Sequence, residues 1–363
     1  MDIKSVKKRI ASLPLVRDFF HWKSERHIYN LEKERFMKEA ADAVANLPES
    51  ERKAILDEYA EVFKKYRFSY PEYYYQYNIA DVSQEERDKF ISRSEVQCFY
   101  RKLNNPAERL RFHNKAAFLC DFAPFIHRKW LLAGKGENSS LDQIIELLHS
   151  DVIIKPLCSS FGVGVSKIKG SELTPAEREE TAAKLLAGES TLVEECIRGC
   201  EELESFHPSS LNTVRVVTEN STGTPTLFHS FVKFGRGGSV IDNAHDCGGL
   251  LAEIDIKTGV VCSNAITTIL GDSDHEYHPD SHKQFKGLKI PHWEKMINTC
   301  IEAHKKSSLM LIGWDVAITQ EGEIEIVEGN HAPDVDAWQQ PLKRGIKEKF
   351  MKVVEGYKRR IKE

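Results

Sequence analysis

The sequence has 363 residues, of which 41% are hydrophobic and 29% are charged, and its formal net charge is −4 at pH 7. This composition excludes an extensively disordered chain, and the balance of charges argues against a basic nucleic-acid-binding protein. The length exceeds what one hydrophobic core usually supports, so we expect two or three lobes.

The eight cysteines are scattered, and no two have the two-residue spacing of zinc or redox motifs. We therefore expect reduced thiols. Charged residues interrupt every apolar run in residues 1–30, so the sequence predicts neither a signal peptide nor a membrane span, and a cytoplasmic location is the expectation. The basic residues between Val6 and Phe20 fit a solvated helix face better than a membrane surface.

The first part of the chain has a helical pattern. Phe36, Ala40, Ala43 and Val44 have the spacing of one apolar face, and Pro48 opens a second helix over 54–63. The aromatic run that follows is interpreted as packing between the helical region and the body of the protein rather than as a stacking platform. Its members are Tyr70, Tyr73, Tyr74, Tyr75 and Tyr77.

From residue 89 to residue 148 the pattern mixes helices and loops, and then it changes to short β-rich segments. The first clear strand is Asp151 to Lys155. Further strands are predicted at 191–194, 212–218, 226–234, 309–319 and 323–328, with helices at 175–186 and 293–306. A last helix places Ile346, Phe350, Val353, Val354, Tyr357 and Ile361 on one face. The alternation predicts an α+β fold.

A lysine at the end of a strand precedes a loop of small residues. Lys155 is followed by Ser159, Ser160, Gly162 and Gly164. Glycine lets the backbone approach a phosphate, and consecutive N–H groups with serine hydroxyls can cradle its oxygens. The loop fits neither common phosphate-binding fingerprint, so a plain hairpin remains the alternative.

Two strands near the C-terminus carry three oxygen ligands. Asp315 points away from its apolar neighbours on the first strand, while Ile324, Ile326, Glu328 and Asn330 are assigned to one face of the second. Pairing Thr319 with Glu323 puts Asp315 within about one residue of Glu328. Two carboxylates so close favour a cation between them, and carboxylate and amide oxygens suit Mg²⁺. The alternative is a hairpin with solvated acids.

These segments together resemble the ATP-grasp superfamily, most closely the sugar-transfer associated ATP-grasp family. The resemblance spans about Asn105 to Pro341 and is carried by the Lys155 loop, LVEECI, SSLNTVRVVT, VIDNAHDCGG, IGWDVAI and VEGNHAPD. It implies two α+β lobes that grip ATP. The helical pattern of the first residues adds an N-terminal accessory region before them in the sequence. The corresponding divisions are 1–88 (accessory), 89–148 (pre-grasp-like), 149–200 (small lobe), 201–341 (large lobe) and 342–363 (C-terminal helix).

The resemblance also implies roles by position. Lys155 and Lys115 match lysines near the nucleotide phosphates, while Glu194, Glu195 and Ile197 match the adenine hinge and Glu202 a ribose partner. Asp315, Glu328 and Asn330 match magnesium ligands, and Asp242, Asn243, Gly248 and Gly249 match a loop beside the active site. Arg215 matches a cation facing the γ-phosphate or an acyl phosphate. Its apolar strand demands an anionic partner, and a salt bridge to a protein carboxylate is the alternative.

The implied activity is that of an ADP-forming carboxylate-amine ligase that uses ATP and Mg²⁺ and passes through an acyl phosphate. Its partners would be a small-molecule carboxylate and an amine, with no nucleic acid and no transmembrane segment, and a homo-oligomer stays open. The family association suggests a sugar acid, amino acid or peptide in cell-surface glycan or natural-product assembly. The alternatives are a kinase of the same fold and a nucleotide-binding protein without ligase activity. His331 is either a base for the amine or, more simply, structural.

Overall fold

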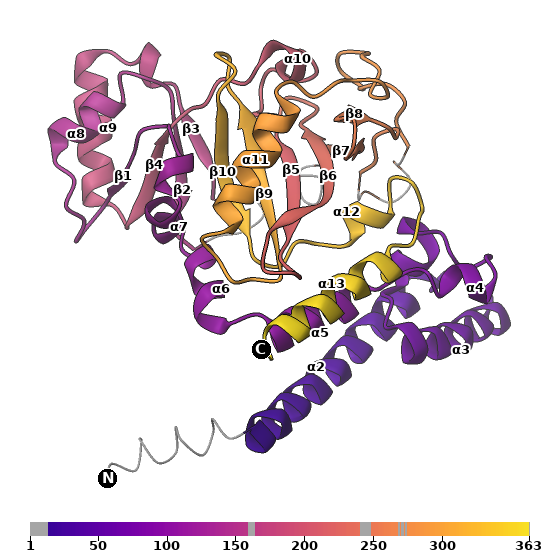
Figure 1. The fold of residues 1–363 in the computed structure, drawn as a ribbon. Coiled ribbons are helices and arrows are strands. Elements are labelled where there is room, and N and C mark those ends of the chain that lie inside the picture. The colour runs from indigo at the N-terminus through magenta and orange to yellow at the C-terminus, as the bar shows by residue number, and fades with distance from the viewer. Residues whose placement is uncertain are drawn as a thin grey trace, which may run out of the picture. The chain divides into compact units, whose positions relative to one another are not determined.

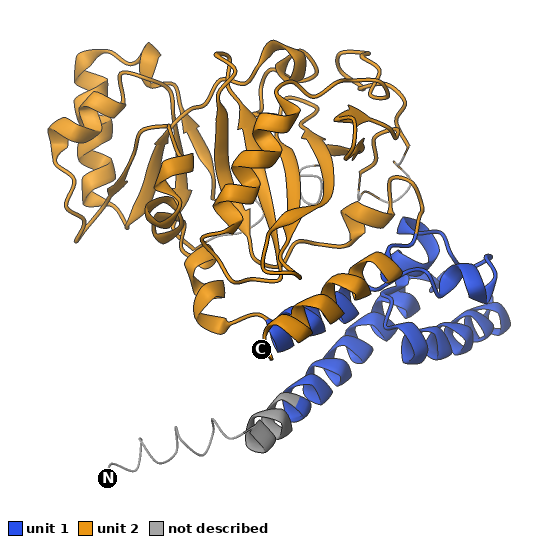
Figure 2. Ribbon diagram, in the orientation of Figure 1, with its two compact units in different colours: residues 1–103, 345–347 blue, residues 104–344, 348–363 orange. Residues whose placement is uncertain are grey.

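The computed structural model describes residues 14–158, 164–239, 248–267, 269, 272 and 274–362 of the chain. Contacts divide the chain into two compact units, drawn in different colours in Figure 2. Unit 1 comprises Met1–Leu103 with Gly345–Lys347, and unit 2 comprises Asn104–Arg344 with Glu348–Glu363. Among the described residues, no helix combines the length and the apolar character needed to cross a membrane.

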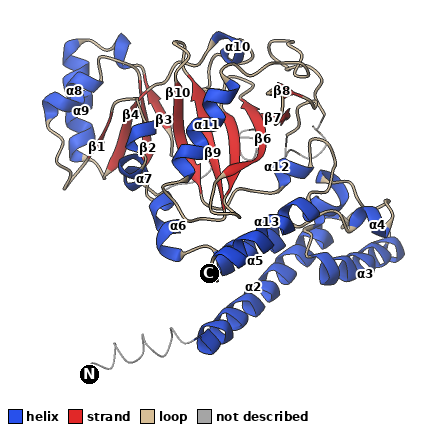
Figure 3. Ribbon diagram, in the orientation of Figure 1, coloured by secondary structure: helices blue, strands red, loops and turns tan. Residues whose placement is uncertain are grey.

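Unit 1 is helical in its described part (Figure 3). Its elements are α2 (Pro14–Ala43), α3 (Glu49–Tyr66), the π-helix η1 (Glu72–Gln76), α4 (Gln84–Arg87) and α5 (Arg93–Leu103). The predicted face on the first helix is confirmed for Phe36, Ala40 and Val44, which are buried, but it is wrong for Ala43, which is exposed at the helix end.

The aromatic run is part of the unit 1 core. Tyr70, Tyr73 and Tyr77 are buried there, Tyr74 is partly buried, and Tyr75 is exposed. Edge-to-face contacts such as that between Tyr59 and Tyr70 join the run to α3. The run therefore packs within unit 1, and its expected packing against the body of the protein stays a prediction.

Unit 2 begins with α6 (Pro106–His113), α7 (Lys115–Asp121) and the short η2 (Ala123–Phe125), and then carries two antiparallel sheets. The small sheet has the order β1-β4-β2-β3 and the bounds Trp130–Ala133 (β1), Thr191–Glu195 (β4), Val152–Pro156 (β2) and Ser166–Ile168 (β3). Strand β1 precedes the segment that the sequence analysis took as the first strand, so that expectation was wrong. In Figure 1, α8 (Leu141–Leu147) and α9 (Pro175–Ala187) lie side by side against this sheet, with η3 (Gly170–Glu172) between β3 and α9.

The large sheet has the order β10-β9-β5-β6-β7-β8. Its strands are β10 (Ile324–Asn330), β9 (Leu311–Ile318), β5 (Val214–Glu219), β6 (Thr226–Phe234), β7 (Leu250–Asp255) and β8 (Val260–Val261). The strands at 250–255 and 260–261 were missed by the sequence analysis. The remaining helices are α10 (Glu201–Glu204), α11 (Trp293–His304), α12 (Asp336–Gln339) and α13 (Lys347–Arg360).

One face of the large sheet is apolar. Val216 of β5 and Trp314 and Val316 of β9 belong to the main hydrophobic core, together with Met296 and Cys300 of α11. Helix α11 lies across this face in Figure 1. Because side chains alternate along a strand, the sequence neighbours of these residues, such as Arg215 and Asp315, project from the opposite face of the sheet. The charged side chains lie on that face.

Most of the apolar face predicted for the C-terminal helix is confirmed. Phe350, Val353, Val354 and Tyr357 are buried, whereas Ile361 lies beyond the end of α13 and is 51% exposed. The prediction for Ile361 was therefore wrong, because the helix ends one residue earlier.

Candidate active site

Three charged residues form a row across neighbouring strands of the large sheet. Asp315 of β9 lies directly opposite Glu328 of β10 on one side and opposite Arg215 of β5 on the other. The Arg215 guanidinium donates two hydrogen bonds to Asp315, from Nε to Oδ1 at 2.5 Å and from Nη2 to Oδ2 at 2.8 Å. The sheet itself therefore brings together an acid, a second acid and a cation.

A β-bulge creates this row. The β9/β10 ladder pairs Ile326 with Val316 and then shifts, so that Glu328 rather than Val327 faces Asp315. Without the extra residue Glu328 would project from the apolar face with Ile324 and Ile326. The sequence assignment of Glu328 and Asn330 to the face of those isoleucines was therefore wrong, although the expected proximity of Glu328 to Asp315 was right.

The electrostatics of the two acids differ. Burial alone would raise the pKa of Asp315, but Arg215 and Lys233 outweigh it and hold the pKa of this carboxyl well below its usual range. Lys233 of β6 adds an ion pair to Asp315 Oδ2 at 3.2 Å. The protein atoms packed around its carboxyl group and then the neighbouring Asp315 raise the pKa of Glu328, although the residue as a whole remains exposed to solvent. The pKa values of the two neighbouring carboxyls are therefore shifted in opposite directions.

Arg215 thus has the protein carboxylate partner that the sequence analysis left open. Gly313 makes room for it, because a Cβ at that position would lie 3.1 Å from both Cδ and Nη1 of Arg215. Lys233 was not singled out from the sequence. A lone lysine within the largely apolar strand 226–234 was the signal that could have found it.

The small sheet contributes Lys155, at the end region of β2. Its Nζ forms an ion pair at 2.6 Å with Glu194 of β4, a side chain that is 2% exposed. Lys115, at the start of α7, is half-buried; desolvation lowers its pKa, and it feels the charges of Glu328, Lys155 and Glu194. The two predicted phosphate lysines therefore share one electrostatic environment with the acid row.

The residues predicted to form the adenine hinge differ in their contacts and burial. Glu194 is fully engaged by Lys155 and Arg128. Glu195 accepts from the backbone N–H of Lys129 at 3.2 Å, and Ile197 is half-buried. Glu202 is exposed on α10.

Several predicted residues lie outside the described part of the chain, namely Ser159, Ser160, Gly162, Asp242 and Asn243. Gly164 is described and has a φ of +75°, with Pro156 at 2.8 Å from where a Cβ would stand. A side chain there would be strained, so glycine is required by the backbone. Gly248 and Gly249 precede β7.

A buried arginine was missed by the sequence analysis. The side chain of Arg128 is 4% exposed and forms ion pairs with Glu194 at 2.6 Å and with Glu325 of β10 at 2.5 Å. It therefore links a strand of the small sheet to a strand of the large one. The only sequence signal was a charged residue next to an apolar run in HRKWLLA.

Asn330 and His331 follow Glu328 on the same segment. The Asn330 side-chain oxygen accepts from the backbone N–H of Ala332 at 2.9 Å. His331 Nε2 lies 3.1 Å from His113 Nε2. Burial, and then His113, lower the pKa of His331 to about 4, so its ring is neutral at neutral pH.

Asp315, Glu328 and Asn330 offer oxygen donors on one sheet face, the ligand type that Mg²⁺ takes. Within the described ranges, no group of three or more His, Cys, Asp or Glu side chains could hold a metal ion. Two carboxylates and an amide are thus a partial donor set. They fit an ion that completes its shell with substrate phosphates and water, as Mg²⁺ commonly does.

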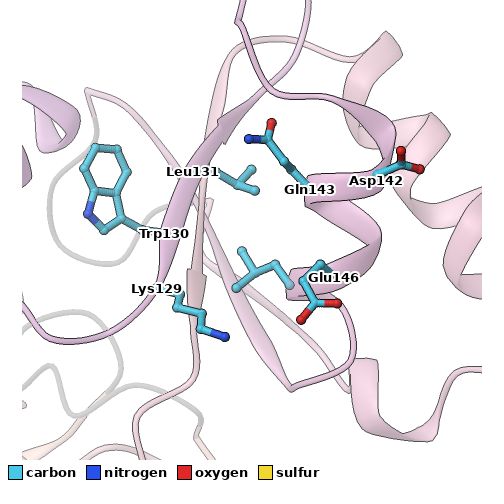
Figure 4. Close-up of a pocket in the computed structure, with 7 residues that line it drawn as sticks. Lys129, Trp130, Leu131, Asp142, Gln143 and Glu146 are labelled. Atoms are coloured by element: carbon cyan, nitrogen blue, oxygen red, sulfur yellow. The ribbon is translucent and has the colours of Figure 1, made fainter.

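A separate pocket of about 490 Å³ lies beside β1 and α8 (Figure 4). It is lined by Lys129, Trp130, Leu131, Asp142, Gln143, Glu146 and Leu147. Figure 4 shows the indole of Trp130 pointing away from the side chain of Leu131. None of the predicted site residues lines this pocket.

Comparisons with known proteins give a family match. The profile of the family described as sugar-transfer associated ATP-grasp matches residues 72–355, more than half of the chain. No curated protein matches the chain. Among solved structures, the ATP-grasp ligase PsnB complexed with minimal precursor is 13% identical, with a TM-score of 0.42 and coverage of 73% of this chain and 68% of that one.

Two further structures are similar to the same degree. D-alanyl-alanine synthetase A from Vibrio cholerae is 13% identical with a TM-score of 0.42, over 70% of this chain and 68% of that chain. D-cycloserine synthetase DcsG is 11% identical with a TM-score of 0.42, over 73% of this chain and 77% of that chain. At such identities and scores these likenesses carry no inference about activity.

Proposed function

Because this chain belongs to the sugar-transfer associated ATP-grasp family, we propose that it is an ATP- and Mg²⁺-dependent, ADP-forming ligase that joins a carboxylate to an amine. The observation that supports this most is the row of Glu328, Asp315 and Arg215, which shares its electrostatic environment with Lys155 and Lys115. Acids that can hold a divalent cation, beside cations that can hold phosphate, are the requirements of phosphoryl transfer.

The first proposed step forms an acyl phosphate. A substrate carboxylate oxygen attacks the γ-phosphorus of ATP, the bond to the bridging oxygen breaks, and ADP leaves. Bound Mg²⁺ would neutralise charge on the phosphates, held by Asp315, Glu328 and Asn330. Lys155 and Lys115 bind phosphate oxygens, and Arg215 stabilises the charge that develops on the transferred group.

The second proposed step forms the amide. The amine nitrogen attacks the acyl carbon, phosphate leaves, and the nitrogen loses its proton. The described site residues act by binding and charge stabilisation, so neither proposed step uses a protein nucleophile. We propose, from the family association alone, a sugar acid, amino acid or peptide as substrate. For the nucleotide we propose that Glu195 and Ile197 border adenine and that Glu202 borders ribose.

A screen of paired carboxylates and amines tests the proposal. ADP, AMP and product mass are measured together, with Mg²⁺ and with EDTA. The expected result is ADP formation that requires both an acid and an amine, with a condensed product. ADP formation with a phosphorylated hydroxyl compound would indicate a kinase, and AMP formation would indicate an adenylate; either result would overturn the ligase assignment.

A further inference from the structure

Arg128 makes a set of contacts that no other described part of the site duplicates. Its Nε and Nη2 donate to Glu194 Oε1 at 2.8 and 2.6 Å, and its Nη1 donates to Glu325 Oε1 at 2.5 Å. The guanidinium also donates to two backbone carbonyls, those of Ile326 at 3.0 Å and Val327 at 2.9 Å. Each of the three guanidinium nitrogens therefore donates at least one hydrogen bond.

The two carbonyls belong to the bulge that orients Glu328. The register of β10 shifts between Ile326 and Glu328, and a bulge interrupts the ladder so that backbone groups there lose regular partners. Buried carbonyls need a donor, and a charged donor forms the stronger hydrogen bond. Arg128 supplies that donor at the residues where the strand changes face.

A second anchor fixes the same strand from the side. Both oxygens of the Glu325 carboxylate are engaged, since Oε1 accepts from Arg128 and Oε2 accepts from the backbone N–H of His127 at 2.7 Å. Glu325 is 1% exposed. The strand is thus held immediately before its bulge by the segment that carries Arg128.

The other end of the arginine reaches the nucleotide side of the site. Glu194 accepts from Arg128 through Oε1 and pairs with Lys155 through Oε2. One carboxylate therefore orients both cations. Arg128 is therefore connected to Lys155 through Glu194 and to the bulge before Glu328 through the two backbone carbonyls.

We propose that Arg128 is a positioning residue that maintains the Val327 bulge, and with it the placement of Glu328 beside Asp315, and that it couples metal binding to nucleotide binding. The proposal rests on the proposed function for the identity of metal and nucleotide. A buried ion pair alone is weak evidence of stability, because well-packed apolar residues often replace such pairs without loss. The contacts with the bulge carbonyls distinguish Arg128 from an ordinary buried ion pair.

The test compares R128M with R178M. Arg178 is a control because it too donates to backbone carbonyls, in its case the three of Leu148, Gly170 and Leu173, but these lie in the small-sheet part of the unit. The dissociation constant of ADP is measured by calorimetry with EDTA and with Mg²⁺, for both variants and the wild type. Mg²⁺ is expected to strengthen ADP binding by some factor in the wild type. We expect this factor to be at least about tenfold smaller in R128M and unchanged in R178M.

A crystal structure of R128M gives a second readout that does not depend on activity. We expect the β9/β10 register to slip so that Glu328 no longer faces Asp315. If R128M does not fold, E325Q replaces it, because it removes one anchor and leaves the pair with Glu194; a smaller loss of the same gain is then expected. An unchanged Mg²⁺-dependent gain, or a retained bulge in R128M, would overturn the proposal.

The two proposals fail in different ways. Failure of the wild type to bind ADP under both conditions would count against the proposed function, and the register of β10 in R128M would still decide the role of Arg128. ADP binding that strengthens with Mg²⁺ equally in R128M and wild type would leave the proposed function standing and overturn the role of Arg128.

Discussion

Each unit of the molecule contains a carboxylate that the fold withdraws from bulk water, and the two are treated differently. In unit 1, Glu72 is 2% exposed and accepts hydrogen bonds from the backbone N–H groups of Ser69 and Arg93 at 2.6 and 2.7 Å and from the Tyr77 hydroxyl at 3.3 Å. In unit 2, Asp315 is held by two cations, and the neighbouring Glu328 is exposed.

The difference separates an acid with a structural role from the acids of the proposed site. The hydrogen bonds of Glu72 join η1 to its surroundings, so its role ends with the fold. Asp315 and Glu328 lie next to each other among arginine and lysine side chains, an arrangement that a hydrophobic core does not need and that binding of a cation and phosphates can use. The comparison predicts that mutations in the two units affect different properties.

Glu72→Ala has the largest expected effect. It leaves the buried donors of Ser69, Arg93 and Tyr77 without an acceptor, and we expect unit 1 to lose about 3–5 kcal/mol of stability. Hydrogen exchange of peptides from α3 and α5 measures this loss, and ADP affinity should be retained. The control is E51A, an exposed glutamate of α3. An equal loss of ADP affinity in E72A would break the separation between the units.

Glu328→Ala should show the opposite pattern. We expect the rate of ADP formation to fall by about 10²–10³-fold, because the variant lacks one proposed ligand of the Mg²⁺ that neutralises charge on the phosphates. Thermal stability should not fall, since the repulsion from Asp315 is relieved. The matched control is E323A, an exposed acid of the same hairpin that pairs with Lys295. Unchanged turnover in E328A would count against the assignment of the site.

The pH dependence of unit 2 sharpens the comparison further. His304 is fully buried between Thr218 and the Leu309 carbonyl, and burial lowers its pKa to about 4 from 6.5. Below about pH 6.5 the unfolded chain takes up a proton that the folded chain refuses until about pH 4. The free energy of unfolding therefore decreases as the pH is lowered from about 6.5 to about 4, and this residue contributes up to about 3 kcal/mol of the decrease.

Urea unfolding of H304Q measures that contribution. Between pH 6.5 and 4 the variant should lose less stability than the wild type, although it is less stable at pH 7 because one buried hydrogen bond is lost. His149 is exposed, and H149Q should follow the wild-type profile. Identical slopes in H304Q and the wild type would rule out the buried neutral histidine as the cause.

The sequence was informative where local patterns decide the structure. The strands at 226–234 and 311–318 and the helix starting at Pro175 follow alternation, apolar content and capping, and the family resemblance agrees with the profile match. The pairing of Thr319 with Glu323 also holds, since the Thr319 N–H donates to the Glu323 carbonyl at 2.9 Å. Local turn geometry therefore placed Asp315 within one residue of Glu328, but it did not place the two side chains on the same face of the sheet.

The bulge and the arginine that holds it could not be predicted in the same way. A register shift at Val327 depends on contacts with Arg128, which is 199 residues away in the sequence. The choice of Asp315 as partner of Arg215 likewise depends on which strands become neighbours, over 100 residues of chain. Strand β1 was missed because four residues, WLLA, carry too short a pattern to distinguish a strand from a helix turn.

The most direct test of the central claim is the binding of Mn²⁺, as a paramagnetic substitute for Mg²⁺, to the ADP complex, followed by electron paramagnetic resonance. We expect the wild type to bind Mn²⁺ in the presence of ADP and E328Q to bind it at least about tenfold more weakly, with E323A as the wild-type-like control. Equal Mn²⁺ affinity in the wild type and E328Q would contradict the claim that the paired acids of β9 and β10 hold the metal.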